Sequence, residues 1–141
     1  NLAAAVGLAA AAELAVAERE AEAARLCALR DTLEARVQER IPGVAVNGGG
    51  PPRLPQTSNL AFPGVEAEEL LVALDLAGFA CSAGSACSSG ALEPSHVLRA
   101  MGLPPERVRG SIRVSLGRAT TAEEVDALAE ALPALVARCR G

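Results

Sequence analysis

One cysteine of this sequence lies in a run of small and hydroxyl-bearing residues, a setting in which a thiol can react. Residues 82–90 read Ser-Ala-Gly-Ser-Ala-Cys-Ser-Ser-Gly, with Cys87 near the middle. The run has no apolar bulk to bury, so we expect a flexible, exposed loop that opens the thiol to nucleophilic and redox chemistry. Extended chain at about 3.4 Å per residue would let the sulfur move on the order of 10 Å. This favours a cysteine that accepts a group in one place and delivers it in another; an incidental cysteine on a surface loop is the alternative.

The other groups with reactive potential are three further cysteines and one histidine. No two of the cysteines form a CxxC pair, so the sequence does not support a zinc site. Cys27 lies at helical spacing among leucines and is expected to be a small buried hydrophobe, and we assign no role to Cys139. Cys81 would pair with Cys87 only in a redox module. His96, at the start of an expected helix, is interpreted as a surface or capping residue and not as a general base for Cys87.

The gross composition limits the class of protein. The chain has 141 residues and a net charge of -4, which suits one soluble domain and argues against nucleic acid as a partner. The uncharged stretch at residues 2–12 is shorter than the roughly 20 residues of a membrane span and has no basic leader. We therefore expect the buried end of a helix at residues 2–12, no membrane segment and a cytoplasmic location. All 13 basic residues are arginine, and the chain has no lysine.

Periodicity and turn signals predict the elements that hold the cysteine run in place. Helices are expected at 2–40, 66–77 and 93–101 and from a capping box at 121–124 onward, where Pro133 should kink or restart the helix. Strands are expected at 44–46, 59–62, 79–81 and 111–116. The last of these alternates between apolar Ile112, Val114 and Leu116 and polar Arg113 and Ser115.

The order of these elements favours a small, mostly antiparallel sheet with helices packed on one face, preceded by a long helix. We divide the chain into a linking helical segment, residues 1–40, and a C-terminal small domain, residues 41–141, that carries the cysteine loop.

Two blocks of sequence resemble one known family. Residues 82–99 are similar to the active-site cysteine signature of group I cysteine desulfurases, the NifS/IscS branch. Residues 111–118, followed by Thr120-Thr121 and Glu123-Glu124, resemble the next motif of that family at the expected distance. Weaker similarity extends over residues 57–65 and 1–14, so the resemblance covers the whole chain.

The resemblance implies a pyridoxal-phosphate enzyme of the class V aminotransferase type, in which this chain is the α+β small domain of an α/β protein. Such an enzyme converts L-cysteine to L-alanine and forms a persulfide that passes to an acceptor, for example an iron–sulfur scaffold. Cys87 matches the persulfide-forming residue, and Arg113 matches the arginine that binds the substrate carboxylate, a task suited to a planar bidentate donor. The alternative for Arg113 is an exposed residue on the polar face of a strand. A homodimer is implied for the complete enzyme.

The absence of lysine departs from the family, because pyridoxal phosphate is held as a Schiff base with a lysine. We therefore expect the chain to be the C-terminal part of a desulfurase, inactive alone, with no cofactor-binding residue of its own. A stand-alone sulfur-carrier, redox or dimerisation domain derived from the family is the alternative.

Overall fold

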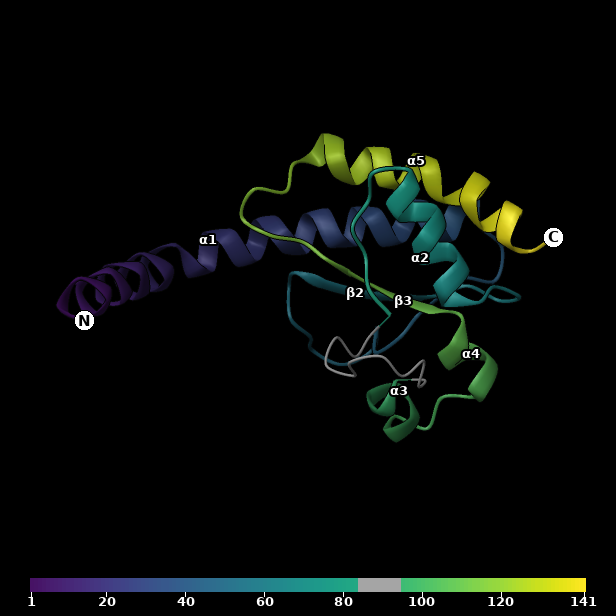
Figure 1. Ribbon diagram of the computed structural model, residues 1–141, viewed down its shortest axis with the longest axis horizontal. Helices are drawn as coiled ribbons and strands as arrows, with labels where there is room; N and C mark the ends of the chain where they lie inside the picture. Colours follow the sequence, from purple (N-terminus) through teal and green to yellow (C-terminus); the bar gives the residue numbers. More distant parts are fainter. Residues whose placement is uncertain (84–94) are drawn as a thin grey trace.

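A three-stranded antiparallel sheet is the framework of the molecule. The computed structural model describes residues 1–83 and 95–141. The strands are β1 (Ala45–Val46), β2 (Thr57–Ala61) and β3 (Ser111–Ser115), and β2 lies between the other two. Figure 1 shows the sheet crossing the centre of the molecule.

The register of β2 and β3 gives the sheet one apolar and one polar face. Leu60 stands opposite Ile112, and both side chains are fully buried. The adjacent pair, Asn59 and Arg113, is only partly buried. Because successive side chains of a strand point to opposite faces, Leu60 and Ile112 share one face and Asn59 and Arg113 the other. We call the side with Asn59 and Arg113 the polar face.

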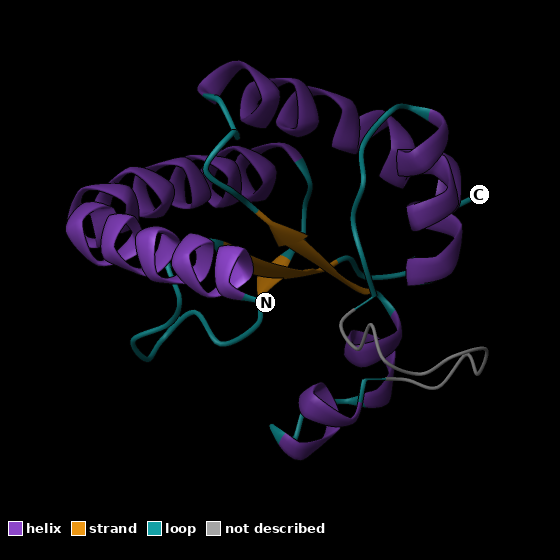
Figure 2. Ribbon diagram, turned by 60° about the vertical axis from the view of Figure 1, so that its left-hand side comes forward, coloured by secondary structure: helices purple, strands orange, loops and turns teal. Residues whose placement is uncertain are grey.

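Three helices cover the apolar face: α1 (Leu2–Arg40), α2 (Ala67–Leu76) and α5 (Ala122–Cys139) (Figures 1 and 2). Each helix contributes a pair of almost fully buried aliphatic side chains to the same core as the strands. These pairs are Leu33 and Val37 of α1, Leu70 and Leu74 of α2, and Leu132 and Val136 of α5. Burial of such side chains, about 1.5–3 kcal/mol each, is what binds the helices to the sheet.

Two short helices, α3 (His96–Ala100) and α4 (Pro105–Arg109), lie together on the side of the sheet away from α5 (Figure 1). Ser95 caps α3 by accepting a hydrogen bond from the main-chain N–H of Leu98 at 3.4 Å. Proline at the first position of α4 fits the start of a helix, where no N–H is needed.

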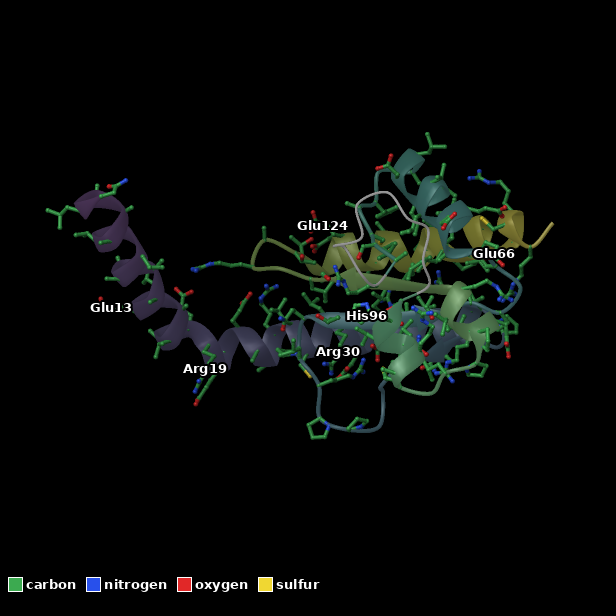
Figure 3. The ribbon with its side chains drawn as sticks, turned by 60° about the horizontal axis from the view of Figure 1, so that its bottom comes forward. Glu13, Arg19, Arg30, Glu66, His96 and Glu124 are labelled. Carbon is green, nitrogen blue, oxygen red and sulfur yellow. The ribbon has the colours of Figure 1, made fainter. Side chains whose placement is uncertain are left out.

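The first half of α1 projects from the rest of the molecule, as Figure 1 shows. The buried residues of this helix begin at Leu26, whereas Leu2 and Leu8 are 82% and 73% exposed. In Figure 3, Glu13 and Arg19 lie on the projecting part and Arg30 lies where the helix reaches the sheet. The expectation of a buried helix end at residues 2–12 was wrong for this chain, because the residues of this apolar stretch are all exposed.

Arg25 of α1 holds the turn that leads out of β3. Its guanidinium donates to the main-chain carbonyl oxygens of Thr120 at 2.7 Å and Gly117 at 3.1 Å. Glu22 accepts two hydrogen bonds from the same guanidinium, at 2.9 and 2.7 Å, and fixes its orientation. The hydrogen bond to Arg25 lowers the pKa of Glu22. Two ion pairs further along, Arg36–Asp126 and Arg40–Glu130, join α1 to α5.

The expected fold class, a small α+β unit with an antiparallel sheet, is confirmed. Most expected elements are present with slightly different ends, and the capping box at Thr121 and Glu124 opens α5. The helix expected at 93–101 is observed as His96–Ala100, and residues 93 and 94 lie outside the described residues. The division into segments 1–40 and 41–141 stays a prediction.

Two of the expectations, the strand at residues 79–81 and the burial of Cys27, were wrong, and two further features of the helices differ from what the sequence indicated. Residues 79–81 do not form a strand, because the main-chain pairing there is the single bridge between Ser82 and Arg113. Helix α4 was not expected, since five residues are too few for a periodic pattern. Helix α5 runs through Pro133 as one helix, so the restart does not occur, and the alternative, a kink at Pro133, stays a prediction. Cys27 is only half-buried, and its sulfur accepts a hydrogen bond from Arg30 at 2.9 Å.

A glycine fixes the point at which β3 begins. Gly110 follows α4 directly, and a Cβ atom at this position would lie 2.5 Å from the main-chain oxygen of Phe62 and 3.0 Å from that of Val65. The main-chain N–H of Phe62 donates to the Gly110 carbonyl at 2.8 Å. The two chain segments can approach this closely only because residue 110 has no side chain.

We expect Gly110→Ala to lower the free energy of unfolding by about 2–3 kcal/mol, because the added methyl group overlaps main-chain atoms that cannot move independently. Urea denaturation followed by circular dichroism measures this change. Gly117→Ala is the matched control, since nothing lies within 4 Å of a Cβ atom at that position, and its effect should stay within about 0.5 kcal/mol. Equal effects of the two substitutions would show that the close approach at Gly110 is not what fixes β3.

Candidate active site

Of the two candidate site residues, the structure describes the substrate-binding arginine, Arg113, and does not describe the nucleophile, Cys87. Cys87 lies outside the described residues, which stop at Ala83 and resume at Ser95. Arg113 lies in the middle of β3, on the polar face, and is half-buried. The alternating pattern of residues 111–116 therefore placed Arg113 on the correct type of element.

Arg113 is joined through its main chain to the segment that precedes Cys87. The main-chain N–H of Ser82 donates to the carbonyl of Arg113 at 3.1 Å, and the N–H of Arg113 donates to the carbonyl of Ser82 at 2.6 Å. This reciprocal pair is an isolated antiparallel bridge. The first residue of the cysteine run is thus held beside Arg113.

The polar face next to Arg113 carries a network of hydrogen bonds that sequence reasoning missed. The side-chain N–H₂ of Asn47 donates to the amide oxygen of Asn59 at 2.6 Å and to the hydroxyl of Ser111 at 2.8 Å. The Nε of Arg107 donates to the amide oxygen of Asn47 at 2.6 Å, and the Ser111 hydroxyl donates to the Arg107 carbonyl at 2.6 Å. These four residues come from three distant parts of the chain, so no local sequence pattern could have indicated the network.

The charge on this face favours a negatively charged ligand. On the polar face the three strands present Ala45, Thr57, Asn59, Ala61, Ser111, Arg113 and Ser115, none of which is acidic. Arg107, from α4, adds a second guanidinium to the same side of the sheet. Guanidinium groups bind carboxylates through paired N–H donors, so this face is chemically suited to a carboxylate.

Neither of the remaining candidate residues, His96 and Cys81, belongs to the hydrogen-bond network on the polar face. His96 is exposed on α3, as Figure 3 shows, which confirms its interpretation as a surface residue. Cys81 is half-buried and packs against the hydrophobic core. Burial raises the pKa of the Cys81 thiol above its ordinary value of 9.0. A thiol with a raised pKa is mostly protonated near neutral pH and is a poor nucleophile.

Residues 1–83 and 95–141 contain no group of three or more histidine, cysteine, aspartate or glutamate side chains arranged to hold a metal ion. No helix in these two ranges is long and apolar enough to cross a membrane.

The residues of this chain do not fit a covalently bound pyridoxal phosphate. That cofactor is held through the amine of a lysine, and all 13 basic residues here are arginine. A guanidinium remains protonated in proteins and cannot form the same bond. We therefore assign no step of a reaction through the cofactor to this chain.

Comparisons with known proteins point to one family. The family model for class-V aminotransferases matches residues 1–128. The chain is 46% identical over 140 residues to the cysteine desulfurase NifS of Azotobacter vinelandii and 46% identical over 141 residues to an IscS-like cysteine desulfurase of Mycobacterium tuberculosis. These alignments cover 99% of this chain but only 35% and 36% of the relatives, so the chain spans about a third of their length.

Solved structures agree with the sequence comparison. A NifS-like protein from Rickettsia africae matches with a TM-score of 0.75 and 27% identity, over 86% of this chain and 31% of that one. Another NifS-like protein matches with a TM-score of 0.77 and 29% identity, over 94% of this chain and 33% of that one. The arrangement of sheet and helices described above is therefore the arrangement of part of the NifS-like fold.

We expect Cys81 to be alkylated more slowly in the folded chain than in the same chain in concentrated urea. Its raised pKa leaves less thiolate at a given pH, and the thiolate is the reacting form. For the same reason the rate in the folded chain should continue to rise at pH values where the unfolded rate has levelled off. Peptide mass spectrometry after timed iodoacetamide pulses measures both rates. Equal rates in the two states would contradict the burial of this thiol.

Proposed function

The chain belongs to the class-V aminotransferase family, and on that premise we propose that it is the C-terminal part of a cysteine desulfurase. The observation that carries the proposal is the bridge between Ser82 and Arg113. It ties the beginning of the cysteine run to the strand residue best suited to bind a substrate carboxylate. A nucleophile and a substrate-binding group that act on one molecule must be held close together in this way.

In the proposed reaction the thiol of Cys87 accepts the sulfur atom of L-cysteine. The carbon–sulfur bond of the substrate breaks, and a sulfur–sulfur bond forms on Cys87. The products, L-alanine and a persulfide, together contain every atom of L-cysteine and of the thiol. Breaking the carbon–sulfur bond needs the chemistry of pyridoxal phosphate, for which the part of the relatives that this chain does not span would have to provide the lysine.

Arg113 is proposed to bind the carboxylate of L-cysteine. Its guanidinium presents paired donors that match the two oxygens of a carboxylate. The main chain of Arg113 is held by its two hydrogen bonds to Ser82 on one edge of β3. On the other edge, the register of the sheet places Arg113 opposite Asn59. An arginine held at its base in this way loses less freedom when it binds an anion.

The finer features of the function follow from the same family membership and stay proposals. They are transfer of the persulfide sulfur to an acceptor protein such as an iron–sulfur scaffold, a homodimer for the complete enzyme, and a cytoplasmic location. A stand-alone sulfur-carrier or dimerisation domain would need neither L-cysteine nor the cofactor, so the two experiments below separate it from a desulfurase.

A chimera tests the proposed activity. We expect a NifS of Azotobacter vinelandii in which this chain replaces the matching 35% to release sulfide from L-cysteine in the presence of a reductant. Cys87→Ser should abolish the release, because a hydroxyl cannot carry the persulfide. Arg113→Lys should raise KM for L-cysteine about 10- to 100-fold, the loss of one charge-assisted hydrogen bond.

Arg118→Lys is the matched control in the chimera. Arg118 is an arginine of the same loop-and-strand unit, but it is 74% exposed and paired with Glu18. We expect the KM of the Arg118→Lys chimera for L-cysteine to stay within about twofold of that of the unsubstituted chimera. A chimera that binds cofactor but releases no sulfide, or a Cys87→Ser variant that releases it normally, would contradict the proposal.

The chain alone should not hold pyridoxal phosphate on any side chain. After incubation with the cofactor and reduction with borohydride, we expect intact-protein and peptide mass spectrometry to find no pyridoxyl group on residues 2–141, because the chain has no lysine. The unmodified NifS serves as the positive control. A side-chain adduct would favour a cofactor-binding domain that functions by itself.

A further inference from the structure

Beside Arg113, the polar face holds an amide whose direction is set by its neighbours. We propose that Asn59 donates a second hydrogen bond to the carboxylate that Arg113 binds, and that Asn47, Arg107 and Ser111 fix the orientation in which it donates. The inference rests on the proposed function, because it needs Arg113 to bind a carboxylate. It adds a substrate-binding residue, Asn59, and a positioning residue, Asn47.

The first step is the orientation of Asn47. The Nε of Arg107 lies 2.6 Å from the amide oxygen of Asn47. A guanidinium has donors and no acceptor, so the atom of Asn47 that faces it must be the oxygen. The N–H₂ group of Asn47 is then on the other branch of the amide, and it donates to Asn59 at 2.6 Å and to Ser111 at 2.8 Å.

The second step is that these bonds form a closed ring. The hydroxyl of Ser111 donates its single proton to the carbonyl of Arg107 at 2.6 Å, so it can only accept from Asn47. Every donor in the ring therefore meets an acceptor. Asn47 and Ser111 are 6% and 3% exposed, and an unmatched polar group at that depth would cost about 1–3 kcal/mol. Reversing the amide of Asn47 is excluded on this ground.

The third step is the consequence for Asn59. Its amide oxygen is committed to the N–H₂ group of Asn47. The N–H₂ group of Asn59 is therefore on the branch of the amide that does not face Asn47. The ring determines that Asn59 offers donors, and not an acceptor, to whatever else approaches it on the polar face.

The fourth step is the distance between Asn59 and Arg113. Both main-chain groups of Arg113 bond to Ser82, and the main-chain carbonyl of Asn59 accepts from Asn47 at 2.8 Å. The pair of Asn59 and Arg113 is thus of the kind that exchanges no main-chain hydrogen bonds, in which the Cα atoms are about 4.5 Å apart and the side chains closest. A carboxylate has about four acceptor positions, enough for a guanidinium and an amide together.

The test uses the chimera described above and the variant Asn59→Asp. This substitution keeps the shape of the side chain and an oxygen for Asn47, but it replaces the donor beside Arg113 by an acceptor. We expect KM for L-cysteine to rise at least 30-fold while kcat falls less than threefold. The inhibition constant for L-alanine should rise in parallel, and that for L-alaninamide, which has no carboxylate, should change less than threefold.

Two further variants separate donation from charge and from folding. Ser115→Asp places the same charge on the same face of β3, at an exposed position, and should change KM less than threefold. Asn47→Asp keeps the acceptor for Arg107 but can no longer donate, so Asn59 must turn its N–H₂ group toward residue 47. KM should then rise about tenfold, and Asn59→Ala should add little to Asn47→Asp, because the two act through one hydrogen bond.

The outcomes also separate this inference from the proposed function. If Arg113→Lys leaves KM unchanged, the proposed carboxylate site is wrong, and the proposed role of Asn59, which depends on that site, is wrong as well. If Arg113→Lys raises KM but Asn59→Asp does not, only the inference about Asn59 is overturned. Equal weakening of L-alanine and L-alaninamide binding, together with a lower melting temperature, would mean that Asn59 has a structural part alone.

Discussion

The pairing of Arg113 with Ser82 is the interaction on which the proposed site depends. It uses both main-chain hydrogen-bonding groups of Arg113, and so it decides which edge of β3 is occupied and which residue stands closest across the sheet. The same pairing determines where the cysteine run begins. A single bridge of two hydrogen bonds is a weak element by itself, so the core beneath β3 must supply the stability that keeps it in place.

The sheet separates the hydrophobic core from the proposed binding site. Its apolar face is covered by three helices and contains the aliphatic core, whereas its polar face carries arginine and asparagine side chains joined by hydrogen bonds. Substitutions on the two faces should therefore have different effects: cavities and steric overlap on the apolar face, and changed affinity for the proposed carboxylate ligand on the polar face. The close approach at Gly110 holds the beginning of β3, and the contacts of Arg25 hold the turn that follows its end. The positions of the residues on the polar face are therefore determined by contacts that the core stabilises.

Elements with strong local signals were predictable from the sequence. The alternation at residues 111–116 and the capping box at Thr121 depend on neighbours along the chain, and both were found where expected. Residues 79–81 have the composition of a strand, but a strand needs a partner, and only Ser82 finds one. The ring around Asn47 joins side chains 60 and 64 positions apart, so no local pattern contains it. Arg113 could be proposed from its motif, whereas the proposal for Asn59 required the register of β2 and β3.

The long first helix has a mechanical consequence. Glu18 of this helix pairs with Arg118, and the 16 helical residues before Glu18, which are all exposed, extend about 24 Å at 1.5 Å per residue. A continuous helix of this length is rigid, so it would pivot at the point where it meets the rest of the molecule. A tilt of about 10° at that point would move Leu2 by roughly 4 Å. A displacement of the exposed leucines of this helix would therefore be transmitted toward the turn that follows β3.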